Sequence, residues 1–140
     1  MSNIKAAYAA IAAWEPTGVT TTRNITAVQL AVADADLPCR LLLPATSTNG
    51  DFVMMGTLQN TAWVVRDLCM WAKVGAGAGV EQYSEAMLDY IASYLTKIKG
   101  KISPAANCVI AGWEVQMGVV PWGNSDYYAV DIYLTIQEKI

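Results

Sequence analysis

Two acidic residues in the segment ADADLP are the first candidates for chemistry in this sequence. Asp34 and Asp36 are separated by one residue, so their carboxylates could hold a hard cation or divide acid and base roles between them. A pair of carboxylates in a polar loop is more often a solvated turn. We therefore keep Asp34 and Asp36 as the candidate site of an alternative function, that of a small ligand-binding or enzymatic domain.

The glycine-rich stretch GAGAG at 75–79 suggests a second kind of site, a phosphate-binding loop. Such loops use glycine because backbone N–H groups must approach a phosphate closely. Here Val80 stands where the GxGxxG pattern has its final glycine, and no Lys-Ser or Lys-Thr pair follows. We expect Gly75, Gly77 and Gly79 to form a flexible connector into a helix, ordered by a partner, and regard phosphate binding as the weaker interpretation.

The sequence contains no histidine. This removes the commonest general base, the Ser/His and Cys/His nucleophile pairs and the usual zinc sites. Cys39, Cys69 and Cys108 are widely spaced and surrounded by apolar residues, which is typical of reduced cysteines in a core. The sequence therefore predicts a protein that is not an enzyme, with no catalytic residue, no metal site and no cofactor.

Composition predicts a protein that contacts other proteins. The 140 residues suit a single domain over 1–140. Hydrophobic residues make up 54% of the chain and charged residues only 15%, and no apolar run is long enough to span a membrane, so we expect no membrane partner. The net charge is −3, and Lys97, Lys99 and Lys101 cluster only where a helix is expected to end. Sequence-specific nucleic-acid binding is therefore not expected.

The N-terminal half reads as one helix followed by strands. Helical spacing of apolar residues predicts a helix over 2–14, and the Thr-rich stretch 15–38 reads as an extended loop with one short strand. Alternation predicts a strand over 38–46, after which STNGD at 47–51 is typical of a turn. The β-forming residues of 57–73 predict a long strand, although RDLCMW taken alone could be helical.

The C-terminal half reads as a helix followed by a hairpin. The clearest helix covers 80–99, and Gly100 ends it. Alternating residues predict strands over 108–120 and 128–137, joined by a turn at PWGNSD. In the last strand the even positions are expected to face the core: Tyr128, Val130, Ile132, Leu134 and Ile136. The predicted fold is α+β, a mainly antiparallel sheet with two principal helices packed on one face and a long C-terminal β-hairpin.

Most of the five tryptophans and seven tyrosines fall on strand positions where core or cross-strand packing is expected. Trp122 differs because it falls in the predicted turn, where a core has little use for an indole, so we expect it to anchor an interface. The residues predicted to contact other subunits or partner proteins are Trp122, Asn124, Tyr127, Gly75, Gly77, Gly79, Asn49 and Phe52.

The order of these segments resembles the small tail-terminator or tail-completion proteins, also called neck proteins, of long-tailed bacteriophages. The resemblance covers nearly the whole chain: an opening helix, ADADLPCRLLLP, then WVVRDLCMWAKVGAGAGVEQYSEAMLDYIASYLTKI, then an aromatic closing hairpin. It includes the strand with the arginine-aspartate pair Arg66 and Asp67. None of these motifs is specific by itself, and the Thr- and Ala-rich stretch 17–33 departs from the pattern.

This resemblance implies a structural virion protein of the phage neck. The family forms a ring of identical subunits, commonly a hexamer, at the head-proximal end of the tail tube, where it stops tube polymerisation and joins the tail to the head. Its partners would be further copies of itself, the tail tube protein and the head connector or adaptor proteins, with DNA only passing through the lumen. Other head-tail adaptor or head-completion proteins fit the same features. Assembly would take place in the host cytoplasm.

Overall fold

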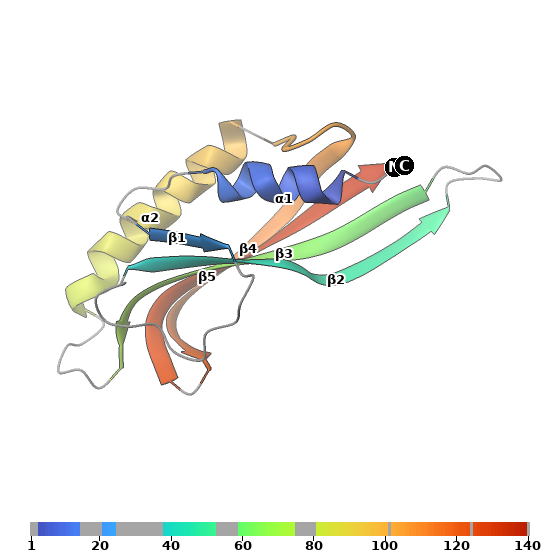
Figure 1. The fold of residues 1–140 in the computed structure, drawn as a ribbon. Helices are drawn as coiled ribbons and strands as arrows, with labels where there is room; N and C mark the ends of the chain where they lie inside the picture. The colour runs from blue at the N-terminus through green and yellow to red at the C-terminus, as the bar shows by residue number, and fades with distance from the viewer. Residues whose placement is uncertain are drawn as a thin grey trace.

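Two helices and a five-stranded sheet make up the described part of this chain in its computed structural model (Figure 1). The structure describes residues 3–14, 21–24, 38–52, 59–74, 81–100, 102–123 and 125–139. In chain order the elements are α1 (Ile4–Ala12), β1 (Thr21–Asn24), β2 (Cys39–Phe52), β3 (Gln59–Lys73), α2 (Glu81–Gly100), β4 (Cys108–Trp122) and β5 (Ser125–Lys139).

The sheet places its strands in the order β1-β2-β3-β5-β4. Strands β2 to β5 pair antiparallel, and the short strand β1 pairs parallel with β2. The α+β class and the mainly antiparallel sheet predicted from the sequence are therefore confirmed. Strand β5 lies between β3 and β4, so the last strand in the chain is an interior strand of the sheet.

One face of the sheet carries the larger core, because both helices pack there. Figure 1 shows α1 and α2 on the same side of the strands. The alternation of β5 supplies one face of this core, as predicted for Val130, Ile132, Leu134 and Ile136, whereas Tyr128 is only half-buried and lies outside it. The fully buried members with less than 2% exposure include Ile11 of α1, Met87, Tyr90 and Tyr94 of α2, and Leu42, Trp63, Val130, Ile132, Leu134 and Ile136 of the sheet.

A second apolar cluster occupies the opposite face of the same strands. Its buried members alternate with those of the first core along β2, β3 and β5, so these strands are covered on both faces in this region. They are Cys39, Leu41, Leu68, Met70, Val120, Tyr127 and Ala129, with Trp122 packed beside them. This two-sided burial explains why apolar residues occupy both faces of these strands in this region.

Two predicted turns are wrong in their bounds. The stretch 47–51 lies inside β2, where Asn49 pairs with Ala62, because pairing with β3 continues to Phe52 and Gln59 and overrides the local turn preference. The hexapeptide PWGNSD is mostly strand: Trp122 pairs with Ser125, and Gly123 has a φ of 59°. Such a positive φ is what a two-residue hairpin connection requires.

Strand β4 departs most from the expected pattern. Its register with β5 shifts between Ile110 and Gly112, so the strand changes the parity of its inward-facing positions there. Cys108 and Ile110 are buried before the shift, whereas Trp113 is 52% exposed after it. Core or cross-strand packing is expected for tryptophans on strand positions; Trp113 pairs with Leu134 of β5 but is not buried in the core.

The N-terminal helix and the C-terminal strand are tied together by one carboxylate. The backbone N–H of Asn3, which precedes α1, donates to Glu138 Oε2 at 2.6 Å, and a buried carboxylate at a helix N-terminus is favoured by the helix dipole. The Cys108 thiol lies 3.3 Å from the same oxygen. Burial, together with the hydrogen bond to Glu138, raises the pKa of Cys108 to about 12.

We expect all three cysteines to resist thiol reagents in the native protein. Cys39, Cys69 and Cys108 are buried as free thiols, and only an accessible thiolate reacts. An Ellman assay at about pH 8 should detect no rapid thiol in folded protein and all three in concentrated guanidinium chloride. A Val119→Cys variant, with its thiol on an exposed position, provides the positive control. Rapid labelling of any native cysteine would contradict the described packing.

Candidate functional site

The strongest polar interaction in the described structure is a buried ion pair between neighbouring strands. Arg40 of β2 and Asp67 of β3 are both 0% exposed. Arg40 Nε lies 2.9 Å from Asp67 Oδ1, and Arg40 Nη2 lies 2.6 Å from Asp67 Oδ2. Two parallel bonds of this kind match the planar guanidinium to a carboxylate, which is the geometry that makes arginine-carboxylate pairs strong and directional.

Arg40 also binds the end of the first helix. Its Nη2 donates to the carbonyl oxygen of Ile11 at 2.9 Å, and its Nη1 donates to that of Trp14 at 2.7 Å. The last carbonyls of a helix lack partners within it, so a cation there satisfies them and complements the dipole. The α2 helix joins through Tyr94, whose hydroxyl donates to Asp67 Oδ2 at 2.6 Å. Four elements therefore meet at this ion pair.

The charges of this cluster are held inside the protein. Burial lowers the pKa of Arg40, but the charge and hydrogen bonds of Asp67 outweigh that effect and raise it above its usual value. Burial, followed by the negative charge of Asp67, raises the pKa of Tyr94, so its hydroxyl stays protonated and donates. Because the donors of Arg40 point to acceptors of its own chain, this cluster positions elements and offers no accessible group for catalysis.

We expect Asp67→Asn to destabilise the fold by about 3–5 kcal/mol, because it leaves a buried guanidinium without its counter-charge. Tyr94→Phe, which removes one hydrogen bond to a charged group, should cost less, about 1.5–3 kcal/mol. Urea unfolding followed by tryptophan fluorescence measures both.

The double variant Arg40→Met/Asp67→Leu is the informative control for this pair. It removes both charges at once, so it should be less destabilised than Asp67→Asn alone. A cost below about 1 kcal/mol for Asp67→Asn would show that the ion pair does not hold these elements together.

A second arginine cluster lies on the other face of the sheet. Arg66 Nε lies 2.9 Å from Asp131 Oδ1 and Nη2 lies 3.0 Å from Oδ2, again a two-bond geometry. The guanidinium carbon lies 5.9 Å from the ring centre of Trp122 and 5.8 Å from that of Tyr133. The hydrogen bond to Asp131 outweighs partial burial and raises the pKa of Arg66. Unlike Arg40, the Arg66 side chain is 21% exposed, so this cluster reaches the surface.

The adjacent residues Arg66 and Asp67 belong to different clusters in the structure. The sequence suggests one arginine-aspartate unit, but alternation along β3 sends the two side chains to opposite faces and to different partners. The partners, Arg40 and Asp131, were not singled out from the sequence. The sequence feature that could have pointed to them is the presence of charged residues of both signs inside apolar strands, because a buried ion pair explains such a pattern.

The predicted interface residues that the structure describes do not lie together on one surface. Trp122 is half-buried at the end of β4, between Arg66 and the second apolar cluster. Tyr127 is completely buried in that cluster, so as described it has no surface to offer to a partner. Asn49 and Phe52 lie on β2 where it pairs with β3, at the opposite end of the strands. Their side chains are not described.

Several predicted positions lie outside the described residues. These are Gly75, Gly77, Gly79, Asn124, Asp34 and Asp36. The described residue that precedes the glycine-rich stretch, Val74, is exposed, and its backbone N–H donates to the carbonyl oxygen of Asp126 at 2.9 Å. This bond ties the end of β3 to the start of β5.

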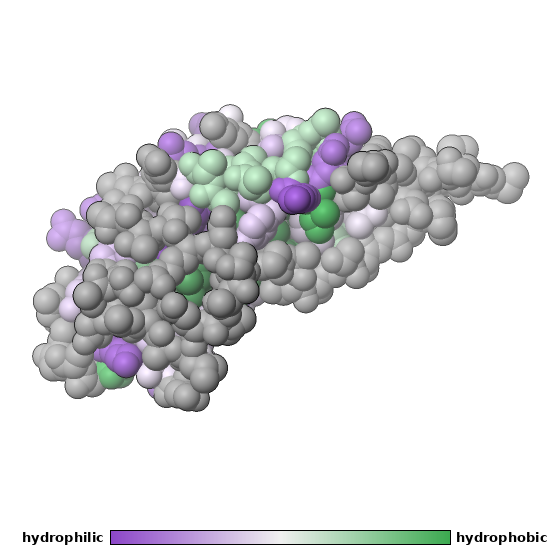
Figure 2. Space-filling view, in the orientation of Figure 1, coloured by the Kyte–Doolittle hydropathy of each residue, from purple (hydrophilic) through white to green (hydrophobic). Residues whose placement is uncertain are grey.

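The described surface also holds an open apolar hollow. It has a volume of about 490 Å³ and lies between α1 and the residues that follow α2, lined by Ala10, Ala13, Trp14, Gly100, Ile102, Ser103 and Pro104. Figure 2 shows the adjoining surface of α1 as weakly apolar, consistent with its exposed alanines. Within the described residues, no group of three or more metal-ligating side chains comes together. Neither described helix is long and apolar enough to cross a membrane.

No protein-family model matches this sequence, and no curated protein matches it. Function therefore has to be inferred from the residues and their arrangement. In the described part, that arrangement consists of two internally paired arginine clusters and of apolar side chains exposed on strand β4, on α2 and just after β3 and α2.

Proposed function

We propose that this protein is a structural subunit of a bacteriophage neck, a tail terminator or tail-completion protein that forms a hexameric ring at the head-proximal end of the tail tube. The ring caps tube polymerisation and joins the tail to the head connector. The order of segments along the chain supports this role, and so does the position of candidate contact residues at two ends of the sheet. Other head-tail adaptor or head-completion proteins are its nearest alternatives.

One observation supports the ring most directly: candidate contact residues lie at two opposite ends of the sheet. Trp122 lies at the β4–β5 turn, close to the end of β3, whereas Asn49 and Phe52 lie where β2 and β3 extend away from the helices (Figure 1). A ring built by head-to-tail contacts needs two different patches on each subunit. A long sheet with one patch at each end meets this requirement.

The chemistry of the first patch also suits a protein contact. Trp122 stacks near Arg66, and aromatic and arginine side chains are enriched where interfaces carry most of their energy. Exposed Val74 lies at the same end of the sheet, because its N–H bonds the start of β5. The sequence supplies no histidine, and the side chains of Arg40 and Arg66 are engaged by aspartates of the same chain. A structural role needs no catalytic group and agrees with each of these features.

We expect Trp122→Ala to abolish capping of tail tubes while costing only about 1–2 kcal/mol of stability, because the indole is half-buried. Negative-stain imaging of tubes mixed with the protein measures capping, and urea unfolding measures stability. Trp113→Ala is the matched control, since it removes an exposed tryptophan elsewhere on the same strand and should leave capping intact.

Two outcomes would count against this function. Normal capping by Trp122→Ala would remove this residue from the tube or ring contact. Wild-type protein that neither forms rings nor binds tube ends would overturn the neck assignment itself. A thermal shift with nucleotides or divalent cations, lost in Asp34→Asn/Asp36→Asn, would then favour the ligand-binding alternative.

A further inference from the structure

Strand β4 is an edge of the sheet with little protection against pairing. Among the described residues, no strand pairs with its outer side from Gly112 to Val120. Before this stretch the edge is covered, since the N–H of Ile110 donates to the carbonyl oxygen of Ile102 at 2.8 Å. Natural edge strands are usually protected by lysine, proline or inward-pointing charge, whereas Glu114 is the single charged residue of this stretch.

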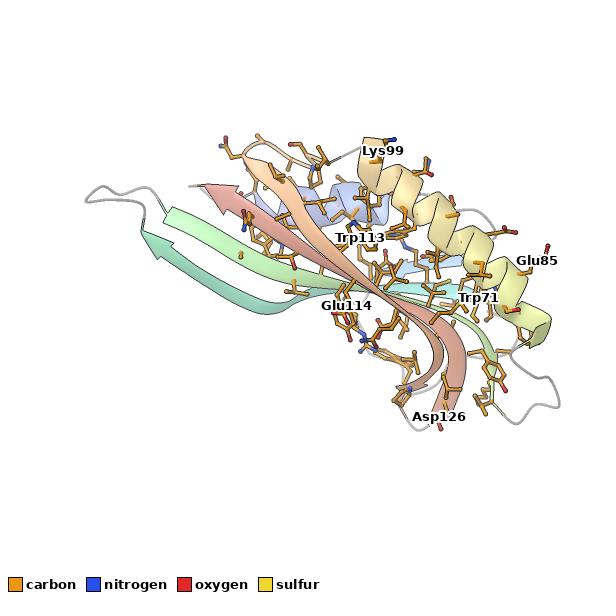
Figure 3. The ribbon with its side chains drawn as sticks, turned by 180° about the vertical axis from the view of Figure 1, so that it is seen from behind. Trp71, Glu85, Lys99, Trp113, Glu114 and Asp126 are labelled. Atoms are coloured by element: carbon orange, nitrogen blue, oxygen red, sulfur yellow. The ribbon has the colours of Figure 1, made fainter. Side chains whose placement is uncertain are left out.

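The same stretch exposes a row of apolar side chains on one face. Trp113, Met117 and Val119 are 52%, 42% and 56% exposed, and Val115 between them is half-buried. They lie on the helix side of the sheet, because Trp113 pairs with Leu134 and Met117 with Val130, both members of the larger core. Figure 3 shows Trp113 on the side of β4 toward α2 and Glu114 on the other side.

We propose that β4 pairs antiparallel with β4 of a second copy of this chain, about a two-fold axis at Val115, so that two sheets become one. In this register Trp113 lies opposite Met117 of the second copy, and Met117 lies opposite its Trp113. Val115 meets its own equivalent. The exposed residues of the row cover each other, and a methionine beside an indole is a favourable contact. Unpaired backbone groups of both edges become satisfied.

The residues on the other face favour this register over its neighbours. Glu114 comes to lie opposite Gln116 of the second copy. Within one copy, Gln116 Nε2 already donates to Glu114 Oε1 at 3.1 Å, so the amide can serve the carboxylate across the axis. An axis at Glu114 would place two carboxylates opposite each other, which is destabilising. An axis at Gln116 would place Glu114 opposite Gly118, which has no side-chain donor.

A second copy suits this edge better than an unrelated strand. In this register the apolar row faces an apolar row and Glu114 faces Gln116, so a second copy supplies a matching residue for each exposed one. The pairing is independent of the proposed ring: a two-fold contact uses the same surface twice and closes with two copies, whereas ring contacts are head-to-tail. The pairing with a second copy covers the edge strand β4 in the free protein.

Disulfide trapping tests the register directly. Residues directly opposite in an antiparallel pair have Cα atoms about 4.5–5.5 Å apart, within the range that a disulfide spans. Val115→Cys should therefore form a covalent dimer with itself under mild oxidation. Trp113→Cys should not, but it should crosslink when mixed with Met117→Cys. The native cysteines are buried and will not interfere.

Ala92→Cys, on the exposed face of α2, reports random collision in the same experiment. Crosslinking of Val115→Cys no faster than that of Ala92→Cys would overturn the pairing. So would crosslinking of Trp113→Cys to itself at the rate of the mixed pair, because the register forbids it.

Light scattering after size exclusion gives the second measurement. Wild-type protein should be dimeric, and Trp113→Lys should weaken the dimer by roughly tenfold or more, because the row is the centre of the contact. Gln116→Lys, on the other face of the same strand, should leave it intact because a lysine there lies opposite Glu114. Circular dichroism checks that each variant is folded.

The two proposals fail separately in these experiments. Monomeric wild-type protein that still caps tubes would overturn the β4 pairing and leave the neck function standing. A crosslinkable dimer that never binds tubes would do the opposite. Dimers that persist in both Trp113→Lys and Met117→Lys would also overturn the pairing, since its apolar row would then be dispensable.

Discussion

The Arg40 guanidinium is the constraint on which the arrangement of this fold depends. It ties β2 to β3 through Asp67, which also accepts a hydrogen bond from Tyr94 of α2, and it closes the end of α1 through two carbonyl oxygens. Taking such a charge out of water costs several kcal/mol unless each group is paired. These bonds tie the two helices and two strands to one another, so the ion pair holds them in one relative placement. Apolar contacts around it supply the main driving force.

The periodic parts of the chain could be predicted from the sequence because local and tertiary preferences agree there. The α2 helix has apolar spacing, early acids and late lysines, and β5 alternates cleanly because its even positions face the larger core. The α+β class followed from these elements. The buried cysteines were likewise predictable, since each lies in an apolar strand.

The features that the sequence did not predict depend on contacts between residues that are distant in sequence. The turn expected at 47–51 became strand because β3 offered a longer partner than local turn residues could resist. Trp113 faces the helix side of the sheet but is 52% exposed, because β4 is the edge strand and no described strand lies beyond it. Arg40 and Asp67 meet across two strands joined by a long hairpin, and no local pattern shows that two opposite charges will share a core. Register and pairing were the missing information in each case.

The position of β5 has a consequence for how the protein is made. This strand comes last among the described elements, yet it lies between β3 and β4 and carries Glu138, which holds the start of α1. While a ribosome is still releasing the preceding strands, β4 has no neighbour in the described sheet and the larger core lacks one of its faces. The chain therefore completes its fold late, through contacts of long sequence separation, and such topologies fold slowly. Until then its apolar strands are exposed to chaperones and to neighbouring nascent chains.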